Sequence, residues 1–197
     1  MQHNVKKLDN GLTLITAPIK DSQTATIMVA FGTGSRYEDQ EIMGMSHFLE
    51  HMFFKGTEKR PNSIDITKEL DGVGAEFNAF TSKDHTAYYV KVAHKHLPLA
   101  IDILSDMLLH SKFDAEELDK EKGVIVEEKR MYEDNPLMYI DDILEEEMFK
   151  GSSLGELIIG TEDTIRATTR ENMVNYRKTH YHGANTAVAV SGNLPSD

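Results

Sequence analysis

The run His-Phe-Leu-Glu-His at residues 47–51 constrains this chain of 197 residues more than any other feature of its sequence. On an α-helix, residues four apart lie on one face, so His47 and His51 point two imidazoles in the same direction, with Glu50 beside them. The apolar neighbours of the run place it on a partly buried helix; they are Met45, Phe48, Leu49, Met52 and Phe53. Because histidines in such a setting need polar partners, the fold must bring another polar group to this helix.

The composition limits what this helix can bind. The chain has no cysteine, so a metal ion would be held by histidine, aspartate or glutamate. Two histidine ligands favour zinc, and a third protein ligand leaves a fourth position for water. The order H-x-x-E-H is that of the inverzincins, in which a carboxylate next to that water can take its proton. We therefore expect one zinc ion per domain, with Glu50 as the general base.

The third ligand is expected on a long helix that begins at Asp114. One stripe of this helix carries residues at three- and four-residue steps: Leu118, Glu121, Ile125, Glu128 and Tyr132. Three of the five are apolar or aromatic, so the stripe is predicted to face inward, where a carboxylate is costly unless it meets a cation or a metal. Glu127 lies on a different and more exposed stripe. We assign the third ligand to Glu128; the alternative is a solvated acidic helix without a ligand.

Hydrophobic patterns predict strands and helices along the whole chain. The strands are expected at 5–8, 12–16, 24–31, 75–81, 86–93 and 186–191. The helices are expected at about 43–54, from 61–63 to 72–74, and at 96–110, 114–132, 136–149, 161–167 and 170–180, with a capping box formed by Asp114 and Glu117. Because hairpins and helix-separated strands both occur, we expect an α+β fold. It has a mixed, mainly antiparallel sheet with helices packed mostly on one face.

Composition and charge exclude several classes of protein. Hydrophobic residues make up 40% and charged residues 27%, which is typical of a globular domain. No apolar run approaches the roughly 20 residues of a membrane span, so no membrane partner is expected. The formal net charge of −12 argues against a nucleic-acid partner. The first residues resemble neither a signal peptide nor a transit peptide, and this favours a cytoplasmic location.

With these residues in place, the sequence resembles the pitrilysin and mitochondrial processing peptidase family of HxxEH zinc metallopeptidases. It is most similar to the bacterial processing-protease-like members. In that family 76 residues separate the motif from a ligand glutamate, and here the same number separates His51 from Glu128. A second functional glutamate lies seven residues before the ligand, which is Glu121 here. Other similar stretches are residues 32–36, Phe-Lys-Gly-Thr at 54–57, and 78–81, 87–89, 134–136, 154–155 and 159–160.

The resemblance implies a processing-peptidase-like metallohydrolase domain and a zinc-dependent endopeptidase that hydrolyses peptides or unfolded protein segments. Its metal ligands would be His47, His51 and Glu128. Glu50 would be the catalytic base, and Glu121 would support catalysis by holding a ligand histidine or the zinc environment. The alternative is a non-catalytic structural or peptide-binding subunit, but such members usually lose motif residues, and all are intact here.

The strand at 75–81 has a further implied role in binding substrate. If it lies at a sheet edge, its free backbone groups can pair with an extended peptide. The resemblance implies that role for Asn78, Ala79, Phe80 and Thr81. The residue pattern by itself favours an ordinary hairpin strand without a ligand.

Family members usually contain two similar halves, and the second half contributes an arginine and a tyrosine that hold the substrate near the zinc. We expect residues 1–197 to be a single metal-binding domain that corresponds to the N-terminal half, with the second half absent. Its expected partners are a peptide substrate and a second homologous half-domain or partner subunit. A truncated chain is the preferred explanation, and a naturally short subunit or a half that pairs with a separate chain are the alternatives.

Overall fold

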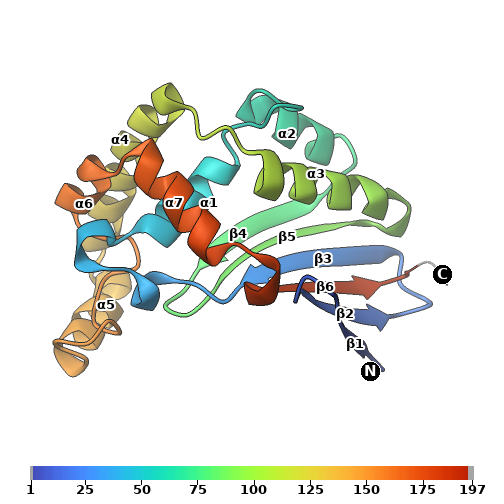
Figure 1. The fold of residues 1–197 in the computed structure, drawn as a ribbon, viewed down its shortest axis with the longest axis horizontal. Helices are drawn as coiled ribbons and strands as arrows, with labels where there is room; N and C mark the ends of the chain where they lie inside the picture. The colour runs from blue at the N-terminus through green and yellow to red at the C-terminus, as the bar shows by residue number, and fades with distance from the viewer. Residues whose placement is uncertain (1, 195–197) are drawn as a thin grey trace.

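A computed structural model describes residues 2–194 and contains one open sheet with strand order β1-β2-β6-β3-β5-β4 (Figure 1). The only parallel pairing in this sheet is that of β2 with β6; the other pairings are antiparallel. The strands are β1 (Asn4–Lys7), β2 (Thr13–Pro18), β3 (Thr24–Phe31), β4 (Glu76–Thr81), β5 (Thr86–Ala93) and β6 (Thr186–Gly192). The predicted mixed, mainly antiparallel sheet of an α+β fold is therefore confirmed.

Seven α-helices accompany the sheet in the described part of the chain. They are α1 (Met45–Phe53), α2 (Ser63–Asp71), α3 (Leu97–His110), α4 (Ala115–Glu133), α5 (Pro136–Met148), α6 (Glu162–Ala167) and α7 (Arg170–His180). Helices α1, α2, α3 and α7 lie over one face of the sheet, and α4 to α6 gather at one end of it (Figure 1). Between residues 2 and 194, no helix combines the length and apolar character needed to cross a bilayer.

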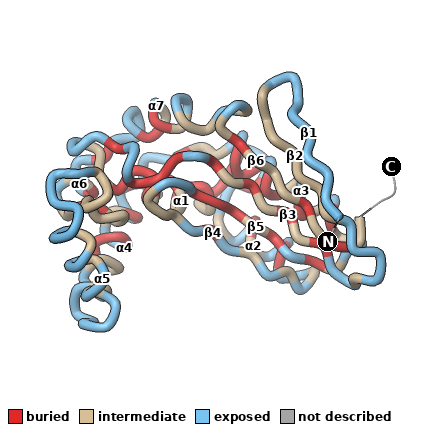
Figure 2. Tube along the Cα trace, turned by 90° about the horizontal axis from the view of Figure 1, so that it is seen from below, coloured by how far each residue is buried: buried red, intermediate tan, exposed pale blue. Residues whose placement is uncertain are grey.

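Burial alternates along β3 because only one face of the sheet is covered by helices. Ala25, Ile27, Val29 and Phe31 are buried, whereas the residues between them are half-buried. The same contrast appears in Figure 2, where buried segments follow the centre of the sheet and α5 is largely exposed. Period-two alternation of this kind is the expected result of a sheet with one packed face.

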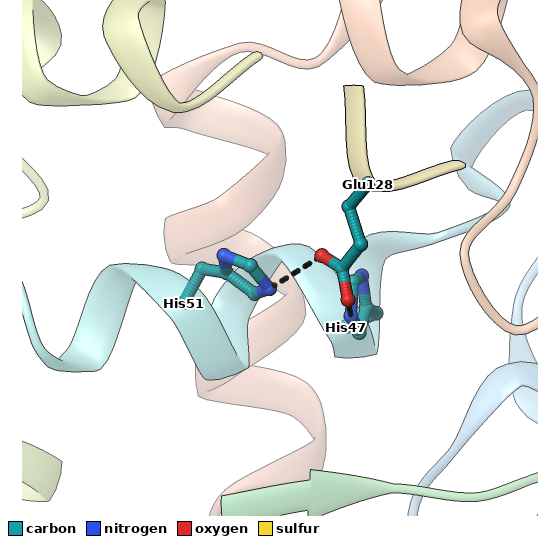
Figure 3. Close-up of side chains that lie close together, drawn as sticks. All are labelled: His47, His51 and Glu128. Atoms are coloured by element: carbon teal, nitrogen blue, oxygen red, sulfur yellow. Dashed lines mark ion pairs between the residues drawn. The ribbon is translucent and has the colours of Figure 1, made fainter. Parts of the chain in front are cut away.

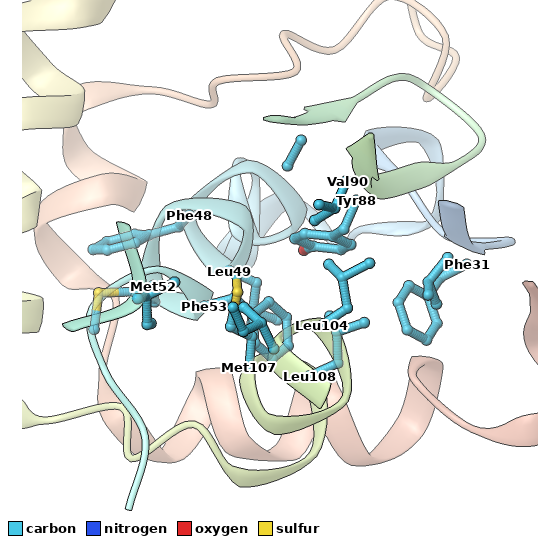
Figure 4. Packing of buried hydrophobic residues seen from close by; sticks show 14 of the residues in the cluster. Phe31, Phe48, Leu49, Met52, Phe53, Tyr88, Val90, Leu104, Met107 and Leu108 are labelled. Carbon is cyan, nitrogen blue, oxygen red and sulfur yellow. The ribbon is translucent and has the colours of Figure 1, made fainter. Parts of the chain in front are cut away.

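The helix that carries the motif is anchored by its apolar side. Phe48, Leu49, Met52 and Phe53 are almost fully buried in the cluster shown in Figure 4. The ring of Phe53 packs edge-on against that of Tyr88 on β5, with 5.4 Å between centroids. Each such side chain contributes about 1.5–3 kcal/mol when it is fully buried. The polar face of α1 is thereby turned away from the core, towards α4.

The start of α4 differs in detail from the prediction. Asp114 is the N-cap, and its side chain accepts a hydrogen bond from the backbone N–H of Glu116. Glu117 does not complete a capping box, because its carboxylate instead pairs with Lys120 one turn further on. The Asp114–Glu117 spacing therefore identified the helix start, but Lys120 competes successfully for Glu117.

A buried arginine joins the segment before α2 to α3. The Arg60 side chain is 3% exposed and its guanidinium bonds Asp106, Asp102 and Glu69 at 2.7–3.0 Å. Thr57 donates a further hydrogen bond to Asp106. Removing one partner leaves the other charge buried without compensation, so the loss of a single member of this network should destabilise the fold. It involves none of the residues predicted to bind metal.

Candidate metal centre

Helices α1 and α4 pack against each other and bring the predicted ligands together (Figure 3). His47, His51 and Glu128 each offer one ligand atom, and these atoms all lie within 4.8 Å of one another. The Nε2 atom of His51 is 3.3 Å from Glu128 Oε2, and Nε2 of His47 is 3.8 Å from Glu128 Oε1. One carboxylate thus faces two imidazoles that stand one helical turn apart.

Glu121 lies two turns before Glu128 and holds the far side of His51. Its carboxylate is 2.8 Å from Nδ1 of His51 and also pairs with Lys55. Burial alone would raise the pKa of Glu121, but the hydrogen bonds from His51 and Lys55 hold it below its ordinary value. An ionised carboxylate on Nδ1 fixes the orientation of the ring and leaves Nε2 directed at Glu128.

Glu50, from the same helix as the two histidines, is in contact with β4. Thr81 donates a hydrogen bond to its carboxylate, with 2.6 Å between Oγ1 and Oε2. Burial raises the pKa of Glu50, and the bond from Thr81 only partly opposes that rise. A carboxylate with a raised pKa beside a groove has the properties of a general base.

A groove of about 490 Å³ opens over this centre. His47, Glu50 and Glu128 form part of its wall, and residues 78–81 of β4 form another part. The rest of the wall comes from α4, α5 and the loop before α6: Lys129, Tyr132, Glu133, Tyr139, Asp142, Leu157, Ile158 and Ile159. β4 is an edge strand of the sheet, so one of its edges carries backbone groups that are not paired with another strand.

The alternative carboxylate, Glu127, points elsewhere. Its side chain is 71% exposed and pairs with Arg130 on the same helix. The inward stripe of α4 is buried at Leu118, Glu121 and Ile125, whereas Val124 and Met131 on the other stripe are exposed. Helical periodicity is therefore the reason that Glu128, and not its neighbour, faces the two histidines.

The residues at this point fit a zinc ion. Two imidazoles and one carboxylate form a common donor set for catalytic zinc, which leaves a position open. Ligands about 2.0–2.2 Å from one ion at tetrahedral angles stand roughly 3.4 Å apart. The separations of 3.3 and 3.8 Å between the imidazole nitrogens and the Glu128 oxygens agree with this arrangement.

The two histidines hold protons with very different strength. Burial, followed by the proximity of His51, lowers the pKa of His47 to about 4, so its imidazole is neutral at physiological pH. Burial alone would also lower the pKa of His51. Hydrogen bonds with Glu121 and Glu128 outweigh that effect and raise its pKa to about 9. In the metal-free chain, His51 is therefore an imidazolium near neutral pH, and a zinc ion that used His51 as a ligand would have to displace its proton.

Zinc affinity is expected to rise with pH up to about 9 and to level off above it. Because the pKa of His51 is raised to about 9, the fraction of chains whose His51 imidazole is protonated increases as the pH falls below that value. Displacement of one proton corresponds to about a tenfold change in affinity per pH unit. Competition with a chromophoric chelator over a range of pH measures this slope.

The matched variant for this measurement is Glu121→Gln. The glutamine removes a charge that raises the His51 pKa, so the plateau should begin at lower pH. An affinity that stays constant between about pH 6.5 and 9, after correction for the chelator, would contradict the assignment of His51 as a protonated ligand.

Sequence reasoning left several residues around this centre unassigned. Lys55 pairs with Glu121, and Thr81 bonds Glu50 in addition to its place on β4. Lys55 belongs to the Phe-Lys-Gly-Thr stretch, which the resemblance singled out without giving it a role. Tyr139 and Asp142 reach the groove from α5, and no spacing relative to the motif indicates this. Such contacts depend on tertiary packing, which single-helix periodicity does not predict.

This fold, with a helix-borne H-x-x-E-H motif and a glutamate from a second helix, defines a domain of the inverted-motif metallopeptidase class. A family profile described as Insulinase (Peptidase family M16) matches residues 14–162. The chain belongs to this insulinase family, peptidase family M16. The resemblance to the pitrilysin and processing peptidase group is thereby confirmed.

Curated relatives from bacteria and mitochondria cover nearly all of the chain. It is 42% identical to the "uncharacterized zinc protease YmxG" of Bacillus subtilis over 94% of its length, which is 45% of that protein. It is 38% identical to the mitochondrial-processing peptidase subunit beta of Bos taurus over 96% of its length, which is 38% of that protein. The chain therefore spans less than half the length of these relatives.

Solved structures show the same fold. A protease from Helicobacter pylori superposes with a TM-score of 0.90 at 25% identity, covering 99% of this chain and 47% of that one. The periplasmic protease PqqL from Escherichia coli gives a TM-score of 0.88 at 27% identity, covering 98% of this chain and 22% of that one. These neighbours agree with the family assignment.

Proposed function

We propose that this chain is the zinc-binding domain of a metalloendopeptidase that hydrolyses peptides or unfolded protein segments. The observation that carries the proposal is the meeting of His47, His51 and Glu128 at one point, with Glu50 beside them on the wall of a groove. Family membership supports it, because the relatives are named as zinc proteases and processing peptidases.

Each residue of the centre has a separate task in this reaction. His47, His51 and Glu128 would hold one zinc ion, which as a Lewis acid would lower the pKa of a water and polarise a peptide carbonyl. Glu50 takes the proton of the attacking water and passes it to the leaving amine. Glu121 does not touch the substrate; it orients His51 through Nδ1 and is in turn held by Lys55.

The substrate would lie along β4 in an extended conformation. β4 is an edge strand, and Asn78, Ala79, Phe80 and Thr81 all line the groove next to Glu50. An added strand would use the free backbone groups of β4, which gives affinity without demanding a particular sequence. Unfolded segments can adopt this conformation, whereas folded proteins cannot offer it without opening.

The chain would act as the metal-binding half of a two-half enzyme. Its relatives are more than twice as long, and one solved neighbour is described as "the first half of the periplasmic protease PqqL from Escherichia coli". A homologous second half, in the same polypeptide or as a partner subunit, is the proposed partner. The other candidate function is a non-catalytic peptide-binding subunit, which would not need the four motif and ligand residues His47, Glu50, His51 and Glu128 to be intact.

Metal analysis and a cleavage assay together test the proposed function. The purified chain should contain or take up one zinc ion, and a second half should give it peptidase activity that a strong chelator removes and zinc restores. His47→Ala should lose both, since two ligands hold zinc far less strongly than three. Zinc binding without chelator-sensitive cleavage, in the presence of the second half, would instead favour the peptide-binding subunit.

A further inference from the structure

The two histidines of the centre differ in what holds them. Nδ1 of His51 is bonded to Glu121, which fixes the ring. Nδ1 of His47 is buried and has no hydrogen-bond partner among the described residues. Zinc-binding histidines usually donate their second ring nitrogen to an orienting group. The placement of His47 therefore depends on where the first turn of α1 is held.

That first turn is capped by a side chain from outside the helix. The N-cap residue is Gly44, which has no side chain to offer and adopts a φ of 91°. Glu38, six residues upstream, supplies the missing acceptor with both oxygens of its carboxylate. Oε2 accepts from the N–H of Gly44 at 2.7 Å, and Oε1 accepts from the N–H of Ser46 at 2.6 Å. Two of the N–H groups that a helix start leaves without partners are thereby satisfied.

A second set of contacts fixes the same turn from its side-chain side. The hydroxyl of Ser46 is 2.8 Å from that of Tyr176 on α7, which is 2.9 Å from that of Thr33 after β3. All three residues are buried. Ser46 directly precedes His47. The backbone N–H of Ser46 is held by Glu38, and its side chain is held by Tyr176.

The backbone also leaves little room for this turn to move. A Cβ on Gly44 would lie 2.5 Å from the carbonyl oxygen of Ile159, and one on Gly160 would lie 2.4 Å from that of Met43. The two chain segments therefore cross in direct contact where α1 begins. Glu38 is only 9% exposed, so water cannot readily replace its bonds.

We propose that Glu38 is a positioning residue that sets the place of His47 through the first turn of α1, with Tyr176 holding the same turn from α7. The inference rests on the proposed metal function of His47. The Glu38 carboxylate would fix the position of His47 as Glu121 fixes that of His51. Glu38 acts through the backbone of α1, whereas Glu121 bonds the imidazole directly. A negative charge at the start of a helix also interacts favourably with the positive end of the helix dipole.

The test measures metal binding in Glu38→Gln. The amide keeps the size of the side chain but turns one acceptor into a donor that faces an N–H group. The zinc dissociation constant should rise about tenfold, the lower end of the effect of removing groups that orient ligands. In the cobalt-substituted chain, the visible d–d bands should change in position or intensity, because they report the arrangement of the ligands.

The matched control is Asp106→Asn in the Arg60 network. This variant disturbs a buried carboxylate that lies outside the centre, so it should lower the urea midpoint and leave zinc affinity and the cobalt spectrum unchanged. If Glu38→Gln does not fold, Tyr176→Phe tests the same turn with the loss of one hydroxyl, and an affinity loss of about threefold is expected.

The outcomes separate this inference from the proposed function. A folded Glu38→Gln chain with wild-type zinc affinity and cobalt spectrum overturns the positioning role alone, as does an unchanged Tyr176→Phe chain where Glu38→Gln fails to fold. An equal loss of affinity in Asp106→Asn also overturns it, because the effect would then follow from general destabilisation. A wild-type chain that binds no zinc overturns the proposed function together with this inference.

Discussion

Replacement of Glu50 by glutamine is expected to leave zinc bound and to lower peptide hydrolysis by about a thousandfold, within the range found for general acid–base groups. The amide has nearly the shape of the carboxylate and can still accept the hydrogen bond from Thr81. It cannot take a proton from water, so the step assigned to Glu50 is lost. Zinc should remain because Glu50 is not one of the three grouped ligands.

The measurement compares turnover per bound zinc in the two chains, each assembled with the second half. A suitable control is Glu127→Gln, which makes the same chemical change on an exposed residue next to the ligand Glu128 and should keep full activity. Activity of Glu50→Gln close to that of the wild type, at equal zinc content, would rule out Glu50 as the base.

The direction of the pKa shift of Glu50 agrees with its proposed role as the base. Burial raises the pKa above the ordinary value of a glutamate, while the Thr81 hydroxyl partly counteracts that effect. A base must hold a proton strongly enough to remove it from water and weakly enough to give it to the leaving amine. The Thr81 contact comes from the same strand that is proposed to bind the substrate, so peptide binding along β4 would be coupled to the proposed base.

Much of the fold could be predicted because the chain is locally consistent. The strand at Thr24–Phe31 has the predicted bounds, because β-branched and apolar residues are ended by Gly-rich sequence. The position of Glu128 followed from helical periodicity, since a stripe shared with Leu118 and Ile125 has to face inward. These predictions depend on one element at a time, which is where sequence patterns are strong.

The contacts between distant elements could not be predicted in this way. No sequence pattern predicts that Glu38 caps the start of α1. A glutamate in a polar loop is expected to be exposed to solvent, and the bonds that Glu38 accepts from Gly44 and Ser46 depend on tertiary packing. The bond between Ser46 and Tyr176 joins residues 130 positions apart. Likewise, the raised pKa of His51 depends on two carboxylates from α4 that meet it only after packing. Tertiary geometry, and not local propensity, determines these parts of the site.

Addition of a homologous second half is expected to raise turnover per bound zinc by about a hundredfold or more, with little change in zinc affinity. Catalysis needs the peptide in a near-attack position, and a misplacement of about 1 Å can cost a hundredfold in rate. In this chain the groove is bordered by β4 on one side and by α4 and α5 on another. Backbone pairing with one edge strand holds only one side of an extended peptide.

The proposed metal ligands, in contrast, all come from α1 and α4 of this chain, so the second half should not be required for zinc binding. A second half would cover the open side of the groove and exclude water, which strengthens the electrostatic interactions of the metal and Glu50 with the substrate. The test compares the 197-residue chain with a version extended through a second domain, using zinc content and turnover of one unfolded peptide. Equal turnover would show that α1, α4 and β4 alone hold the substrate well enough, and that the second half has another task.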